Sequence, residues 1–145
     1  MGSYVTDFVH FVSNHWMLWS LLAVIMVLLA FVEFRSRRHG PVRLDTTMAT
    51  QLMNKENALV LDIRDLNAFN KGHILGAQSL LFSQLDTQIT RFDKHKDKPV
   101  LLVCEQGHQS VLAGTKLKKQ GFMRVYSLSG GMGAWRNAGL PLEKK

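Results

Sequence analysis

The chain holds one cysteine, Cys104, within the sequence VLLVCEQGHQS at residues 100–110. The four apolar residues before it predict a buried strand, and the polar residues after it predict a loop, followed by a helix from about Ser110. Gly107 can take a positive φ, so this loop can turn several backbone N–H groups toward its centre. Such amides and a helix N-terminus favour negative charge, which suits a nucleophilic thiolate and an anionic substrate. The residues leave a second interpretation open, because most lone cysteines are small buried side chains without chemistry.

Strands and helices alternate in the part of the chain that would position this loop. Apolar runs predict strands at 58–64, 78–82, 100–104 and 124–128, and helical spacing predicts helices at 45–55, 66–71, 110–120 and 132–139. Asp45 or Thr46 would cap the first of these helices. In the helix 110–120, the residues expected to face inward are Val111, Leu112, Thr115 and Leu117. This alternation is typical of a parallel α/β sheet, in which sites form at the carboxyl ends of the strands. Cys104 and Asp62 both lie at or near such an end.

Composition separates the first forty residues from the rest. Residues 41–145 carry 15 of the 18 Lys/Arg and 9 of the 11 Asp/Glu, and about a hundred residues suffice for one domain with a modest core. The basic residues are scattered and not interleaved with aromatic ones. This predicts a solvated surface able to face anionic lipid and argues against nucleic-acid binding. A single cysteine allows no disulfide within the chain, which suits a reducing compartment.

Residues 16–32, WMLWSLLAVIMVLLAFV, are apolar except for Ser20. At about 1.5 Å per residue this run spans roughly 25 Å, the short end of what crosses a bilayer. Arginines follow at 35, 37 and 38, whereas no Lys or Arg precedes the run. The positive-inside rule then predicts an outward-facing segment at 1–15, a transmembrane helix at 16–34 and a basic linker at 35–42, with the remaining domain in the cytoplasm. A cleaved signal peptide is disfavoured, because its positive charge would precede the apolar run.

Three stretches resemble single-domain rhodaneses: LVLDIRDLNAFNKGHILGAQSL, VCEQGHQS and LKKQGFMRVYSLSGGMGAWRNAGLP. They place the resemblance over about residues 43–142 and leave a short tail at 143–145. It implies an α/β fold, a rhodanese-like parallel sheet flanked by helices, here preceded by one N-terminal transmembrane helix. The layout is similar to bacterial inner-membrane rhodanese-like proteins, which implies a single-pass protein of that membrane.

The resemblance also implies a chemistry. A cysteine in the position of Cys104 attacks the outer sulfur of a donor such as thiosulfate, and the persulfide that forms passes its sulfur to a thiol acceptor. The substrate-binding loop would be Glu105, Gln106, Gly107, His108, Gln109 and Ser110, supported by Asp62 and Arg64, with no metal and no cofactor. Many active members carry arginines in this loop. Here Gln109 takes the last arginine position and Glu105 adds a carboxylate, so we expect thiosulfate to be a poor substrate.

Two functions of different classes remain open. The first is a sulfurtransferase that uses a small anionic sulfur donor or a persulfidated protein. The second is a rhodanese-fold interaction module at the cytoplasmic face of the membrane, binding a membrane protein with little or no catalysis. The lipid bilayer is an expected partner in both, and nucleic acid in neither. A cysteine phosphatase is disfavoured, because Gln109 cannot bind phosphate bidentately as the arginine of a Cys-x5-Arg loop does.

Overall fold

The computed structural model describes residues 14–144, without the side chains of residues 33–39. Most of the predicted outward-facing segment 1–15 therefore lies outside the described residues, and so does residue 145, the last of the predicted tail. The chain divides into two compact units, residues 1–38 and residues 39–145. Each unit is described by itself below.

Helix α2, Trp16–His39, has 24 residues, and all of them except His39 belong to the first unit. Its side chains from Trp16 to Val32 are exposed on all sides of the helix. Within residues 14–144, no helix has both the length and the apolar character that crossing a membrane requires. The transmembrane helix expected at 16–34 stays a prediction.

The second unit is built on a five-stranded sheet whose strands are all parallel, in the order β1-β5-β4-β2-β3. The strands are β1 Val42–Leu44, β2 Leu59–Asp62, β3 Gln78–Ser79, β4 Pro99–Val103 and β5 Arg124–Leu128. Every residue of β2 and β4 is buried, as their apolar runs predict for central strands covered on both faces. The α/β class and the parallel sheet expected from the sequence are confirmed.

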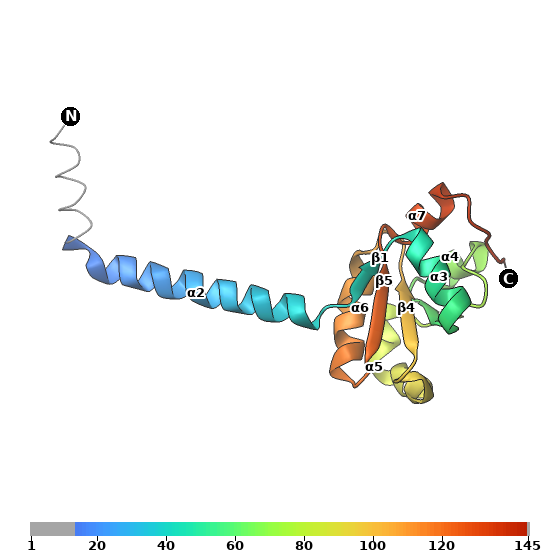
Figure 1. Ribbon diagram of the computed structural model, residues 1–145, viewed down its shortest axis with the longest axis horizontal. Helices are drawn as coiled ribbons and strands as arrows, with labels where there is room; N and C mark the ends of the chain where they lie inside the picture. Colours follow the sequence, from blue (N-terminus) through green and yellow to red (C-terminus); the bar gives the residue numbers. More distant parts are fainter. Residues whose placement is uncertain (1–13, 145) are drawn as a thin grey trace. The chain divides into compact units, whose positions relative to one another are not determined.

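Helices cover both faces of this sheet (Figure 1). One layer holds α6, His108–Lys119, with α5, Leu85–Gln88, and the 3₁₀ segments η1, Phe82–Gln84, and η2, Ile89–His95. The other holds α3, Thr46–Glu56, and α7, Gly131–Asn137, and α4, Leu66–Lys71, lies on that side in the same view. Asp45 and Asp65 cap α3 and α4 through their side chains, so each helix begins directly after its aspartate. The two layers enclose two apolar clusters, one on each face.

Two expectations about these elements are wrong. Leu112 does not face inward but is 60% exposed, because α6, which begins at His108, buries Ser110, Ala113, Gly114 and Leu117 instead. Edge strand β1 has no counterpart among the predicted strands, since only Leu44 of its three residues is buried and no apolar run marks it. It pairs with β5 and forms one edge of the sheet.

Candidate active site

Cys104 follows the last residue of β4, and the first turn of α6 closes around its sulfur. The backbone N–H of Gly107 donates to Cys104 Sγ at 3.0 Å and that of Ser110 at 3.4 Å. Gly107 has φ +90°, the positive value expected for it. Only 2% of Cys104 is exposed, yet it lines an open hollow of about 310 Å³ with Glu105, Gln106, His108 and Gln109. Two N–H donors at a helix N-terminus suit a sulfur that carries negative charge.

A pair of buried hydroxyl groups keeps Ser110 in this position. Ser110 Oγ donates to the carbonyl of Gly107 at 3.1 Å and lies 3.0 Å from Ser127 Oγ in β5. The thiol of Cys104 can donate to the same Ser110 Oγ at 3.5 Å. Ser110 and Ser127 are both fully buried. The hydroxyl pair ties the first turn of α6 to the sheet and so fixes the N–H group that contacts the sulfur.

The first turn of α7 also holds the cysteine loop. Met132 N–H donates to the carbonyl of Cys104 at 2.9 Å, and Gly133 N–H donates to that of Glu105 at 3.1 Å. Gly131 has φ +56°, and a Cβ added to it would lie 2.2 Å from the Cys104 carbonyl oxygen. Backbone packs directly on backbone here, and only glycine leaves the space for it.

Two arginines bind the carboxylate of Glu105. Arg64 Nη1 donates to Glu105 Oε2 at 3.1 Å, and Arg136 Nη2 donates to Oε1. Arg64 is itself buried and pairs with Asp62, at 2.7 Å from Nη2 to Oδ2, and with the carbonyl of Gly72 at 2.8 Å. Glu105 therefore lowers the positive field of the loop by a route that its position in the sequence does not reveal. It pairs with Arg136, which has no other ion-pair partner among the described residues, and it adds a second carboxylate to Arg64, which Asp62 already pairs.

These contacts shift two pKa values. The hydrogen bond from Arg136 is the largest influence on Glu105, and with the contribution of Arg64 it outweighs burial and lowers the pKa of the carboxyl. Burial acts to lower the pKa of Arg64, but Asp62 and Glu105 outweigh it and raise that pKa above its ordinary value. Both groups are charged at neutral pH, and the network is paired throughout.

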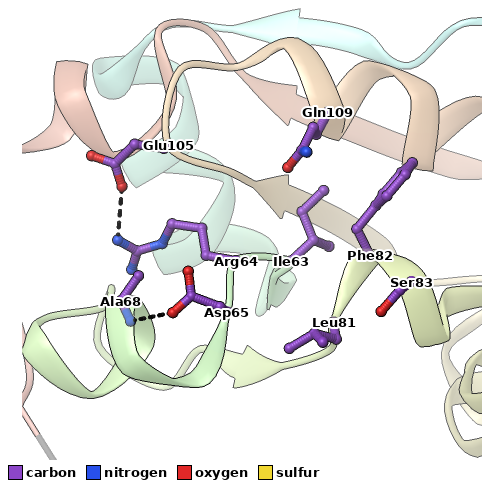
Figure 2. A pocket seen from close by; sticks show the side chains of 9 residues that line it. All are labelled: Ile63, Arg64, Asp65, Ala68, Leu81, Phe82, Ser83, Glu105 and Gln109. Atoms are coloured by element: carbon purple, nitrogen blue, oxygen red, sulfur yellow. Dashed lines mark hydrogen bonds and ion pairs between the residues drawn. The ribbon is translucent and has the colours of Figure 1, made fainter.

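A larger hollow of about 610 Å³ shares Glu105 and Gln109 with the hollow of the cysteine. Figure 2 shows Arg64 and Glu105 on one side of it, Gln109 and Phe82 on the other, and Ile63 between them. Its remaining lining residues are Asp65, Ala68, Leu81 and Ser83. A molecule bound at the cysteine would thus have an adjoining space with an apolar floor.

The structure brings the residues singled out from the sequence to one edge of the sheet. Gly107 and Ser110 contact the sulfur, and Asp62 binds Arg64, which in turn binds Glu105. The exposed residues Gln106, His108 and Gln109 line the hollow. Arg136, Ser127 and Gly131 complete the site but are not among the predicted site residues. Ser127 and Arg136 lie 17 and 31 positions from their partners Ser110 and Glu105, so no local pattern in the sequence joins them. For Gly131, the glycine pair 130–131 is the local signal of its close packing on the cysteine loop.

A family model described as Rhodanese-like domain matches residues 45–138. The chain is 34% identical over 137 residues to YibN of Escherichia coli K12, an alignment that covers 94% of this chain and 96% of YibN. It is 43% identical over 94 residues to the thiosulfate sulfurtransferase GlpE of Pseudomonas putida F1, covering 65% of this chain and 84% of GlpE. The crystal structure of the Anabaena Alr3790 protein superposes with a TM-score of 0.63 at 26% identity, covering 70% of this chain and 82% of that one. The chain belongs to the rhodanese-like domain family.

Proposed function

We propose that this protein is a sulfurtransferase that carries sulfane sulfur as a persulfide on Cys104. The observation that carries the proposal is the sulfur of Cys104 with two backbone N–H donors at the base of an open hollow. The similarity to thiosulfate sulfurtransferases such as GlpE supports the same function.

The loop suits both halves of such a cycle. In the first half, the thiolate of Cys104 attacks the outer sulfur of the donor, the donor's sulfur–sulfur bond breaks, and the electron pair leaves with the donor remnant, which is sulfite for thiosulfate. In the second half, a thiolate acceptor attacks the outer sulfur of the persulfide and Cys104 keeps the electron pair of the broken bond. No net oxidation occurs. The N–H groups of Gly107 and Ser110 can stabilise the negative sulfur at the start and end of the cycle.

The donor need not be thiosulfate. The exposed Gln109 stands in the hollow where many active relatives have an arginine, and Glu105 occupies both nearby guanidinium groups. We expect an organic persulfide, whose reacting group carries less negative charge than thiosulfate, to charge the protein faster than thiosulfate does. Turnover with each donor and a thiol acceptor tests this, with Cys104→Ala as the inactive control. A rate in Cys104→Ala equal to that of the natural protein would refute catalysis by Cys104.

A second candidate is an interaction module with little or no catalysis. The same two features favour it, because a paired network and an uncharged Gln109 leave little positive charge for an anionic donor. In that case the larger hollow beside the loop would receive a side chain of a protein partner. Absence of turnover and of any sulfur adduct with every donor class would favour this function over the first.

We further propose that residues 16–34 anchor the protein in the bacterial inner membrane, with the N-terminus outside and the rhodanese-like domain in the cytoplasm. The apolar run 16–32, the exposure of its side chains around α2 and the arginines at 35, 37 and 38 support this. The alignment with YibN covers 94% of this chain, so it includes most of the N-terminal unit.

Two measurements test the anchor and its orientation. The natural protein should remain in the membrane fraction after alkaline carbonate washing, whereas a variant lacking residues 16–34 should not. A cysteine reagent that cannot cross the membrane should leave Cys104 unlabelled in intact cells and label it after lysis in mild detergent. Labelling in intact cells would contradict the orientation.

A further inference from the structure

A third hollow, of about 300 Å³, lies against Glu105 and is markedly cationic. Three of its lining side chains carry positive charge, and the one carboxylate among them is that of Glu105. The lining residues are Arg64, Ala68, Lys71, Gly72, Glu105, Arg136 and Leu142. Glu105 also lines the hollow of the cysteine, so the two hollows share this residue.

The cations of this hollow are not equally available. Arg64 is buried, and its donors are committed to Asp62, Glu105 and the carbonyl of Gly72. Arg136 is different, because its side chain is 44% exposed and its one ion pair within residues 14–144 is with Glu105. Lys71 is exposed and has no carboxylate within ion-pair distance in the described part of the chain.

Glu105 itself shows what kind of group this hollow accepts. Its two carboxylate oxygens each receive a different guanidinium group, one from Arg64 and one from Arg136. A carboxylate from another molecule could take the exposed half of this arrangement, with Arg136 and Lys71 as its partners. Arginine suits planar carboxylates in particular, through paired N–H donors.

We propose that Lys71 and Arg136 form a subsite for the carboxylate of the thiol acceptor, which competes with Glu105 for Arg136. This inference rests on the sulfurtransferase function and names the acceptor class as a thiol that also carries a carboxylate. Ala68 and Leu142 add an apolar lining to this hollow, which suits the carbon chain of such a molecule.

The position of the subsite assigns it to the acceptor and not to the donor. The sulfonate of thiosulfate is bonded directly to the sulfur that Cys104 attacks, so it must bind within the cysteine hollow. Neither Lys71 nor Arg136 lines the cysteine hollow, so a molecule that reaches them must extend from its reacting sulfur past Glu105, the residue that both hollows share. In the transfer step, the acceptor thiolate attacks the outer sulfur of the Cys104 persulfide, a new sulfur–sulfur bond forms on the acceptor, and Cys104 leaves as a thiolate.

The test measures only the second half-reaction. The full-length chain, in detergent, is charged to the Cys104 persulfide, and its discharge is followed with mercaptocarboxylates of increasing length and with mercaptoalcohols of the same lengths. Each rate is divided by the rate of the same thiol with a small-molecule persulfide. For at least one length we expect the carboxylate to be preferred about fivefold, the effect of one charge-assisted contact at a partly exposed site. The preference should disappear in Arg136→Gln, decrease in Lys71→Gln and increase in Glu105→Gln.

Arg91→Gln is the matched control, because Arg91 is an exposed arginine of η2 that lines none of the three hollows. It should keep the preference of the natural protein. The proposal would be overturned if, at every thiol length, Arg136→Gln showed the same preference for the carboxylate over the alcohol as the natural protein does.

A binding measurement separates this inference from the sulfurtransferase function. With Cys104→Ala, NMR titration of 3-mercaptopropionate should show binding that Arg136→Gln weakens about fivefold. If no donor charges the natural protein but this Arg136-dependent binding is found, the sulfur-transfer function fails and the carboxylate subsite stands. If neither Cys104→Ala nor the natural protein binds the carboxylate in an Arg136-dependent way, the subsite is refuted.

Discussion

The packing of Gly131 on the cysteine loop predicts a large effect for Gly131→Ala. Gly131 has φ +56°, and a Cβ there would lie 2.2 Å from the carbonyl oxygen of Cys104 and 2.7 Å from that of Glu105. Since real Cβ atoms essentially never come closer than 3.0 Å, the loop or the turn must move by roughly 0.8 Å, from 2.2 Å to at least 3.0 Å. That movement displaces the atoms that hold the reactive sulfur.

The cost in unfolding free energy has two parts. A left-handed φ costs an alanine about 1–2 kcal/mol. The movement also weakens the hydrogen bonds from Met132 N–H and Gly133 N–H to the loop carbonyls, each worth about 0.5–1.5 kcal/mol. We expect Gly131→Ala to lower the unfolding free energy by about 2–5 kcal/mol. Persulfide formation should slow about 100-fold, because a misplacement near 1 Å costs a reacting group about that much.

Gly76→Ala provides the matched control. Gly76 has φ +74°, but no atom lies within 4 Å of an added Cβ, so only the backbone cost of about 1–2 kcal/mol applies. Urea unfolding gives the two free energies, and a time course of intact mass gives the two rates of sulfur uptake. If the two variants have equal unfolding free energies and Gly131→Ala takes up sulfur at the rate of the natural protein, the contact with Gly131 does not hold the loop.

Three further predictions concern single side chains of the site. Ser110→Ala should lower the unfolding free energy by about 1–3 kcal/mol, because it leaves the buried hydroxyl of Ser127 without this partner. Urea unfolding measures this free energy, and a change under about 0.5 kcal/mol would contradict the role of the hydroxyl pair. Gln109→Arg should raise kcat/KM for thiosulfate about tenfold by adding the missing charge, whereas the uncharged Gln109→Met should not; an unchanged rate in the arginine variant would show that charge is not limiting. The third prediction concerns pH. The pKa of Glu105 is lowered in the folded chain, so its ion pairs stabilise the fold above the ordinary value of 4.5, and this contribution is lost as pH falls toward the lower folded value. Because the side chain is half exposed, the difference between the natural protein and Glu105→Gln should be under about 1 kcal/mol and should shrink below pH 4.5, and a difference that grows with acidity would contradict the assigned pairing.

Much of the fold is predictable from the sequence, since the signals that set it are local. The apolar runs before Asp62 and Cys104 are long enough to mark central strands. Of the two residues that the sequence offers as the helix cap, Asp45 and Thr46, the structure shows Asp45 in that role. The inward position expected for Leu112 is wrong, because the face of α6 that packs on the sheet is formed mainly by the small residues Ser110, Ala113 and Gly114 and Leu112 lies on the opposite side of the helix. Gly114, at the centre of that face, packs against Pro41, where an added Cβ would come within 2.5 Å. No periodicity of apolar residues reveals a small residue used in this way.

In the cysteine loop, too, some features are predictable from the sequence and others are not. Its glycine and the helix after it are readable in the sequence, and so is the absence of an arginine at Gln109. The partners of Glu105 are not, because Arg64 and Arg136 lie 41 and 31 positions away and meet it only once the sheet is formed. A carboxylate next to the cysteine suggests local repulsion of an anion. Its actual effect depends on which cations it binds, and that is a property of the tertiary structure.

The most direct test of sulfur transfer by Cys104 is the intact mass of the protein after incubation with thiosulfate, polysulfide or a small-molecule persulfide. We expect the mass to increase by one sulfur atom with at least one donor, the increase to disappear on adding a thiol acceptor, and Cys104→Ala to show no increase. A protein that gains no sulfur from any donor, or a Cys104→Ala variant that gains it equally, would contradict the assignment of Cys104 as the sulfur carrier.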